Sequence, residues 1–232
     1  MSEIIAVVGQ TGTGKSTSVE NLNPKETVII GMTNKPLPFR GWKQHYTSGE
    51  GGNYLITHDS AKIVKVLDFI DKKKPEVKQV IIDDFQYLMS SEFMERSDEK
   101  GWEKFTDIAK HVWNVITKAR DLRDDLKVVF MCHDEIVTEN FHPKRKIKTI
   151  GKLLDEKITL EGLFTVVLFT DIQKVQNEEQ LQYTFITQND GTTTGKSPRG
   201  MFEALNIPND LNEVIKKINA YYLGDETLNS QE

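Results

Sequence analysis

The sequence predicts an α/β fold, with a mostly parallel central sheet, helices on both faces and a late antiparallel hairpin. Short β-branched runs alternate with longer segments of helical period along the 232 residues. The runs 4–8 and 80–82 are apolar without interruption, which is typical of strands covered on both faces. Two β-rich runs at 165–172 and 180–187 are joined by the polar segment 173–179, a pattern that favours a hairpin.

Each element has its own local signal. The first strand, 4–8, leads into a glycine-rich segment and then into a helix that we expect to reach about Leu22, where Asn23-Pro24 ends it. A second strand covers 27–32, and the prolines and glycines of 34–54 predict a loop. The later elements are a helix at 60–72, a strand at 80–82, an amphipathic helix at 102–124, a strand at 127–131, the hairpin of 165–187 and a closing helix at 210–222.

Composition limits the class of protein. We expect one domain at 1–224 and a flexible tail at 225–232, because no repeat or long linker interrupts the pattern. No apolar run approaches the roughly 20 residues of a membrane span, so we expect no membrane partner. Cys132 is the only cysteine, which excludes an internal disulfide and fits a reducing cytoplasm. The net charge of −5 means that any nucleic-acid contact must be local.

A phosphate loop is the most specific motif in the chain. The segment Gly9-Gln10-Thr11-Gly12-Thr13-Gly14-Lys15-Ser16 matches G-x-x-x-x-G-K-[ST] at every fixed position, and Thr17 continues it. Glycines let backbone N–H groups converge on phosphate oxygens, and the start of the following helix adds a positive field. Lys15 is expected to bind the β- and γ-phosphates, and the Ser16 hydroxyl to ligate Mg²⁺. The motif predicts a nucleoside triphosphate, ATP with Mg²⁺, although the loop itself does not distinguish adenine from guanine.

Polar residues follow two of the predicted strands. Asp83, at the end of the strand that covers 80–82, is expected to hold the Mg²⁺ shell together with Ser16. Asp84 is the candidate general base for an attacking water, or alternatively a cap of the next helix. His133 is expected either to contact the γ-phosphate or its water, or to be hydrogen-bonded in the rim. Glu135 is a further candidate for the same neighbourhood.

These motifs, in this order, resemble the RecA-like P-loop ATPases of phages. Those are compact, single-domain, AAA-type nucleotide-binding proteins associated with recombination and single-strand annealing. The likeness covers about residues 3–223 and includes the segment 194–199, which precedes a final helix. It implies a RecA core, Mg²⁺-dependent ATP hydrolysis, assembly into rings or filaments, and a role in DNA recombination or replication. It also implies phage recombination or single-strand-binding proteins as partners, in the host cytoplasm.

The sequence departs from this family at one catalytic position. RecA-like proteins usually place a catalytic glutamate at the end of the second strand, whereas this chain reads Gly31-Met32-Thr33-Asn34 there. The role of base therefore passes to Asp84 or is poorly filled. We expect hydrolysis to be slow without DNA or a partner.

Two groups of cations suggest further contacts. Four charges lie within five residues just after the strand that precedes His133, on Lys144, Arg145, Lys146 and Lys148. In RecA-like proteins the loops that follow this strand face the polynucleotide, so we hypothesise single-stranded DNA binding here, with Phe141 as a stacking surface. The alternative is a solvated basic hairpin. Lys196 and Arg199 lie in a polar stretch that we expect to be flexible, and are candidates to reach the γ-phosphate of a neighbouring subunit.

Two other functions remain open on the sequence alone. One is a loader-type module in which nucleotide controls partner binding and little hydrolysis occurs. The other is a small-molecule P-loop kinase, for which Arg120 and Arg123 are the available lid cations, although their place at the end of a long helix favours surface charges.

Overall fold

The central sheet runs through the whole molecule. The computed structural model describes residues 1–139, 141–151, 153–174 and 180–223, and these form an eight-stranded sheet in the order β10-β9-β8-β1-β5-β4-β2-β3. The strands are β1 (Glu3–Val8), β2 (Thr27–Gly31), β3 (Tyr54–Ile56), β4 (Gln79–Asp83), β5 (Lys127–Cys132), β8 (Val166–Lys174), β9 (Leu181–Ile186) and β10 (Asn206–Pro208).

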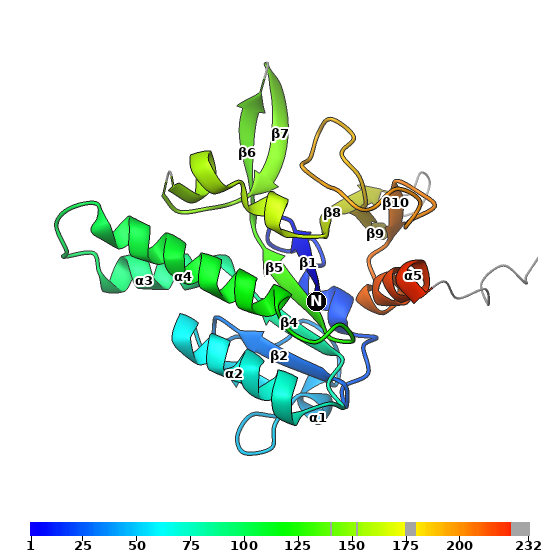
Figure 1. Cartoon of the computed structure of the whole chain (residues 1–232). Helices are drawn as coiled ribbons and strands as arrows, with labels where there is room; N and C mark the ends of the chain where they lie inside the picture. The colour runs from blue at the N-terminus through cyan, green and yellow to red at the C-terminus, as the bar shows by residue number, and fades with distance from the viewer. Residues whose placement is uncertain (140, 152, 175–179, 224–232) are drawn as a thin grey trace, which may run out of the picture.

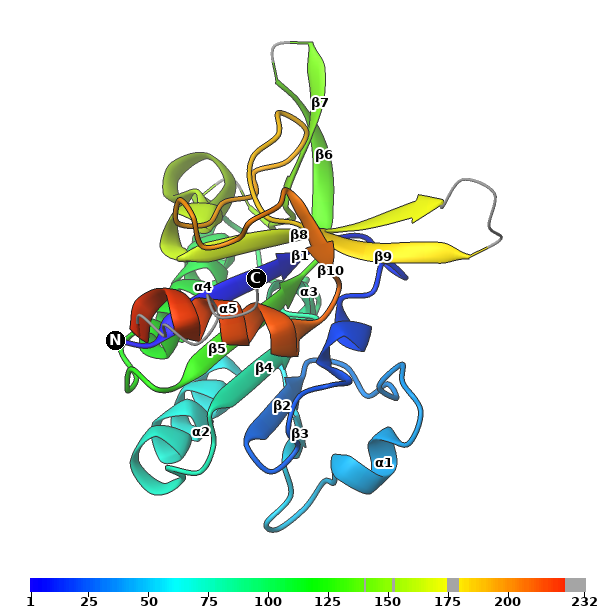
Figure 2. The same cartoon turned by 90° about the vertical axis from the view of Figure 1, so that its right-hand side faces the viewer.

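Strand direction divides the sheet into two parts. From β8 to β3 all neighbours are parallel, while β8–β9 and β9–β10 are antiparallel. The β8–β9 hairpin extends beyond the parallel strands (Figure 2). Register places Val8 level with Cys132 on one side and Phe169 on the other. The segments that follow β1, β4 and β5 therefore meet at one edge of the sheet, which confirms the predicted α/β fold.

Helices cover both faces of the sheet (Figure 1). On one face lie α2 (Ser60–Lys73), α3 (Gln86–Glu95) and α4 (Glu103–Arg120), packed on side chains such as Ile82. On the other lie α5 (Leu211–Leu223) and the 3₁₀ turn η1 (Ser16–Val19), packed on side chains such as Ile81. Consecutive strand residues point to opposite faces, and here helices cover both of them. The β-branched runs therefore show no alternation with polar residues.

The helix predicted after the phosphate loop is wrong in kind and length. Only the 3₁₀ turn η1 forms, where the sequence suggested a helix to about Leu22. Thr17, Ser18 and Val19 are poor helix formers, and the Ser18 hydroxyl donates to the Lys15 carbonyl at 2.5 Å. A turn this short adds little helix dipole to the phosphate site.

Several further elements were not predicted from the sequence, among them the short strands β3 and β10. The loop at 34–54 contains α1 (Trp42–His45), and α3 was not expected because its apolar residues keep no single face. A two-stranded sheet, β6 (Asp134–Glu139) with β7 (His142–Ile147), projects from the end of β5 as a hairpin (Figure 1). Its strands are polar, so periodicity gave no signal. The turns η2 (Leu153–Ile158) and η3 (Leu160–Leu163) then lead to β8.

The remaining predicted boundaries fall close to the observed ones. α4 ends at Arg120, shorter than predicted, and the expected hairpin at 165–187 is formed by β8 and β9. The predicted tail at 225–232 lies outside the described residues. Within the part of the chain that the structure describes, none of the helices combines the length and apolarity needed to cross a bilayer.

Candidate functional site

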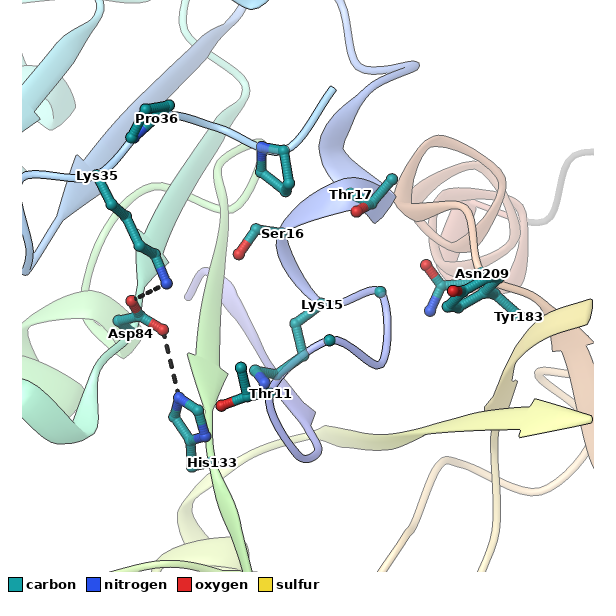
Figure 3. Close-up of a pocket in the computed structure, with 13 residues that line it drawn as sticks. Thr11, Lys15, Ser16, Thr17, Lys35, Pro36, Asp84, His133, Tyr183 and Asn209 are labelled. Carbon is teal, nitrogen blue, oxygen red and sulfur yellow. Dashed lines mark ion pairs between the residues drawn. The ribbon is translucent and has the colours of Figure 1, made fainter. Parts of the chain in front are cut away.

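A cleft of about 500 Å³ lies at the carboxyl edge of the parallel strands. Loops from both halves of the sheet contribute to it, and Figure 3 shows their side chains converging from opposite sides. Its lining residues are Thr11, Gly12, Gly14, Lys15, Ser16, Thr17, Lys35, Pro36, Pro38, Asp84, His133, Tyr183 and Asn209. The structure thus brings the phosphate loop, Asp84 and His133 together, as the sequence predicted.

The phosphate loop has a backbone that requires glycine. Gly12 and Gly14 have φ of 81° and 95°, in the left-handed region. A Cβ on Gly9 would lie 1.8 Å from Thr170 Oγ1, so the loop passes too close to β8 for any side chain there. The Thr13 and Thr170 hydroxyls are 2.6 Å apart and share a hydrogen bond. The loop is therefore fixed to the sheet on the β8 side.

Lys15 is folded back onto its own loop. Its Nζ donates to the carbonyls of Gly9 and Gln10, each at 2.7 Å. Burial lowers the pKa of Lys15, against the opposing influence of the nearby Asp84 and Asp83 carboxylates. An anionic phosphate would compete for this ammonium more strongly than neutral carbonyls do, because charge-assisted hydrogen bonds are the stronger kind.

Ser16 and Asp83 form the pair expected to hold a metal ion. The Ser16 hydroxyl lies 2.9 and 3.0 Å from the two carboxylate oxygens of Asp83. Burial first, and then the charge of Asp84, raise the pKa of Asp83. Hydroxyl and carboxylate oxygens suit Mg²⁺, which typically takes one or two such protein ligands plus phosphate oxygens and waters. No group of three His, Cys, Asp or Glu side chains suited to a metal occurs among the described residues.

Asp84 is held by an unusual backbone angle and by contacts with three side chains. Its φ of 59° is left-handed, unusual for a residue other than glycine, and its side chain is buried. In an extended strand, the side chains of consecutive residues point to opposite faces of the sheet. The left-handed φ of Asp84 ends this alternation directly after Asp83. Thr33 Oγ1 donates to Asp84 at 3.2 Å, Lys35 forms an ion pair with it, and His133 Nε2 lies at 3.5 Å (Figure 3).

These partners decide the charge of Asp84. Burial works to raise its pKa, but the contacts with His133 and Lys35 outweigh burial and bring the pKa to about 2. Asp84 is therefore a carboxylate already engaged by cations. The Asp84 side chain does not cap α3, because that helix begins at Gln86 without a side-chain cap.

Two hydrogen bonds of its backbone fix the position of His133. Its N–H donates to Gln86 Oε1 at 3.0 Å, and its carbonyl accepts from Lys148 N at 2.9 Å. The ring meets Tyr87 edge-on, with centroids 6.4 Å apart, and faces the cleft (Figure 3). Glu135 does not line this cleft; it lies on β6 and pairs with Lys146 at 3.6 Å.

Lys35, Tyr183 and Asn209 line the cleft but were missed by the sequence reading. Lys35 lies shortly after β2, at the same edge as the phosphate loop, and this position after a parallel strand was its only signal. Tyr183 and Asn209 pack on Gly14, where an added Cβ would lie 3.1 Å from Tyr183 Cδ1 and 3.0 Å from Asn209 Oδ1. Nothing in the local sequence places them there.

Three cations of the basic run lie on β7, outside the cleft, and Lys148 follows that strand. Those three face carboxylates of the β6–β7 hairpin: Lys144 with Glu139 at 2.8 Å, Arg145 with Asp134 at 2.6 Å, and Lys146 with Glu135 at 3.6 Å. Lys148 instead lines a second cleft beside Gln10 and Tyr87. Phe141, at the hairpin turn, is 98% exposed.

The segment around Lys196 is more ordered than predicted. Lys196 forms two backbone hydrogen bonds with Val167, at 2.7 and 3.0 Å, and so extends the sheet. Its side chain is half-buried, and burial lowers its pKa. The expectation that this stretch is flexible is therefore wrong at Lys196. Arg199 is exposed, with its carbonyl accepting from the Tyr221 hydroxyl at 3.3 Å.

Comparison with known proteins places this geometry in a family. A family profile described as an AAA domain matches residues 2–199, most of the chain. The chain belongs to this AAA-domain family. It is thus a nucleotide-binding domain of the P-loop ATPase type, a class that generally binds ATP with Mg²⁺.

Two other comparisons add less to the assignment. Among solved structures, a KaiC-like protein from Pyrococcus horikoshii OT3 is similar at 12% identity and a TM-score of 0.46, over 80% of this chain and 78% of that one. A search of curated proteins gives no match. The family assignment therefore comes from the profile and from the site.

Proposed function

We propose that this chain is a Mg²⁺-dependent ATPase that acts on single-stranded DNA in recombination or replication, as an oligomer. One observation carries the ATPase part of the proposal: a single cleft has the phosphate loop on one side, with Asp83 hydrogen-bonded to its Ser16, and Asp84 with His133 on the other. Phosphate-binding groups and candidate water-orienting groups thus face each other across the space that a triphosphate would enter.

Each residue has a task in hydrolysis. Loop N–H groups and Lys15 hold the phosphates, and Ser16 with Asp83 would hold the metal. Mg²⁺, when bound, offsets the negative charge of the phosphate oxygens. Asp84 and His133 are the groups to orient water, whose oxygen bonds to the γ-phosphorus while the bond to the bridging oxygen breaks and leaves its electron pair on ADP. The proton that the water loses passes to an oxygen of the released phosphate and from there to solvent.

Phosphate release measured with and without Mg²⁺, and with and without a single-stranded oligonucleotide, tests the proposal. We expect release that needs Mg²⁺, increases with DNA and is lost in Lys15→Ala. Release that persists in Lys15→Ala would contradict the assignment of the cleft. If the rate of phosphate release is the same with and without DNA, the chain is an ATPase but the proposed action on single-stranded DNA is contradicted.

The DNA and assembly parts of the proposal rest on two surface features. The β6–β7 hairpin projects from the end of β5 (Figure 1). Phe141 at its turn is exposed, which suits it to stacking on a base. Exposed Arg199 is the remaining candidate to reach a neighbour's γ-phosphate. If Arg199→Ala leaves the dependence of turnover on protein concentration unchanged, a role in trans is excluded.

The second candidate function is a nucleotide-controlled module with little turnover. The ion pair and contacts that hold Asp84 favour it, because a carboxylate with a pKa of about 2 is a weak proton acceptor. Tight Mg²⁺-ATP binding without phosphate release, in the presence of DNA, would select this function.

A small-molecule kinase fits the geometry less well. Arg120 lies at the far end of α4, where its carbonyl accepts from Ser2 N at 3.1 Å, beside the start of β1. Arg123 donates to the carbonyls of Ile70 and Lys74, at 2.9 and 3.0 Å. Both arginines therefore lie at the edge opposite the cleft, where no lid over the phosphates can use them.

A further inference from the structure

We propose that Lys35 is a second cation for the terminal phosphate, supplied by the same chain as the phosphate loop and used to distinguish ATP from ADP. In this structure Lys35 pairs with Asp84, which holds its ammonium at the cleft (Figure 3). The inference rests on the proposed triphosphate binding and adds the residue that reads the third phosphate.

The first support is position. Lys35 and Lys15 line the same cleft from two different loops, with Ser16 between them in the view of Figure 3. Lys35 pairs with Asp84, and Ser16, the residue after Lys15, donates a hydrogen bond to the neighbouring Asp83. A phosphate bound by Lys15 and the Ser16–Asp83 pair therefore enters the field of Lys35.

The second support is that the backbone of Lys35 is held by hydrogen bonds while its half-exposed side chain has room to turn. The Tyr54 hydroxyl donates to the Lys35 carbonyl at 3.1 Å, and Lys35 N donates to the Thr33 carbonyl at 3.0 Å. Pro36 follows and restricts the backbone of the residue before it. Beyond that anchor, the side chain is 51% exposed and carries its charge on a flexible four-carbon stem.

The third support is that Asp84 does not depend on Lys35 alone. Thr33 and His133 also contact its carboxylate, so the buried oxygens keep partners when the ammonium turns toward a phosphate. An ammonium has three donors, which lets it bind a phosphate oxygen and stay near Asp84. Placed between the two, it offsets the repulsion that a terminal phosphate and Asp84 would otherwise exert on each other.

A structural role of Lys35 and a role in binding the third phosphate predict different effects of its removal. If the lysine only neutralises Asp84, its loss weakens ATP and ADP binding alike, by disturbing the cleft. If it reads the third phosphate, its loss acts on ATP and spares ADP. The ratio of the two affinities therefore separates the two roles.

The experiment measures by titration calorimetry how tightly Lys35→Gln binds a non-hydrolysable ATP analogue or ADP, each in the presence of Mg²⁺. We expect affinity for the ATP analogue to fall by about tenfold or more, the usual effect of one charge-assisted hydrogen bond, while affinity for ADP changes by less than about twofold. Retained ADP binding also shows that the variant is folded. Equal losses for both nucleotides, or no loss for either, would overturn the proposal.

Matched variants complete the test. Lys43→Gln removes the same charge from the same 34–54 excursion but outside the cleft, and is expected to leave both affinities unchanged. Lys35→Arg keeps the charge and is expected to restore most of the preference for the ATP analogue. Tyr54→Phe removes only the hydrogen bond to the Lys35 carbonyl and is expected to lower that preference by a smaller factor.

Wild-type protein separates the two hypotheses. If it binds neither nucleotide, the proposed function and the role of Lys35 both fail. If it binds both nucleotides and Lys35→Gln leaves their ratio unchanged, only the role of Lys35 fails.

Discussion

The β6–β7 hairpin and the cleft both begin at the carboxyl end of β5, but they balance charge in different ways. On the hairpin, Lys144, Arg145 and Lys146 each face a separate carboxylate. Along the cleft, Lys15 and Lys35 line a space in which Asp84 is the one carboxylate among the lining residues that the structure describes. The cleft therefore has positive charge available to an anion.

This contrast shows that a basic run in the sequence is not the same as a basic surface. The run at 144–148 suggested a polynucleotide contact, yet three of its charges are matched across the hairpin. The cleft had a single cation in its sequence motif and gained a second, Lys35, from the loop that follows β2. The four predictions that follow test this comparison, in order of expected effect.

Removing the cation of the phosphate loop is expected to have the largest effect. Lys15→Ala deletes the donor for two phosphates, so nucleotide affinity should fall on the order of a thousandfold, as expected for two charge-assisted hydrogen bonds. Titration with a fluorescent ATP analogue measures it. Lys144→Ala on the hairpin is the control and should bind nucleotide normally; similar losses in both variants would remove the distinction between the two regions.

Within the hairpin, Arg145 is expected to matter far more than Lys144 for stability. The Asp134 side chain that Arg145 contacts is 1% exposed, and Arg145 also donates to the Thr170 carbonyl at 3.1 and 3.2 Å. Arg145→Ala leaves a buried carboxylate unpaired and should lower the free energy of unfolding by about 3 kcal/mol. Lys144→Ala breaks a pair with the exposed Glu139 and should lower the free energy of unfolding much less, because solvent screens exposed pairs. Urea denaturation of both variants checks the difference.

Asp83→Asn is expected to separate activity from stability. Burial and the neighbouring Asp84 raise the pKa of Asp83, so its charged form is disfavoured in the fold, and a neutral isostere should leave the melting temperature equal or higher. Metal-dependent phosphate release should nevertheless fall roughly 10- to 100-fold, by analogy with losses at metal-site groups. A lower melting temperature with unchanged release would mean that Asp83 is structural.

The smallest effect is expected on DNA affinity. Lys148 lines the second cleft, beside the phosphate loop, and has no carboxylate partner among the described residues, whereas Lys144 is paired with Glu139 at 2.8 Å. Lys148→Ala should therefore weaken binding of a labelled single-stranded oligonucleotide more than Lys144→Ala, by about twofold, and reduce its salt dependence. Equal effects would show that the hairpin pairs open when DNA binds.

Local sequence was sufficient for the phosphate loop and for most strands. The loop is one continuous segment whose glycines allow backbone angles that other residues avoid, so its eight positions carry the whole signal. Strands β1, β4 and β5 were recognisable because burial on both faces leaves an uninterrupted apolar run. Asp83 followed from one of these strands, since parallel strands end at a common edge.

Local sequence failed where polar residues take their structure from distant partners. Strands β6 and β7 contain few apolar residues, and their structure depends on pairing with each other. The turn η1 replaced a helix because Thr17, Ser18 and Val19 disfavour one and the Ser18 hydroxyl binds the backbone. Lys196, expected to be mobile, is held by Val167 of β8, a strand nearly thirty positions earlier in the chain.

By itself, then, the sequence determined that this chain holds a phosphate loop on a parallel sheet, because those features depend on neighbouring residues and on burial. Only the tertiary structure decided which charges act together. Asp84 meets Thr33, Lys35 and His133 because β2, β4 and β5 end at one edge, and long-range contacts of this kind leave no periodic trace in the sequence. The strand order determines whether a charged side chain is paired with an opposite charge or can bind an anion, and so determines the chemistry of the cleft.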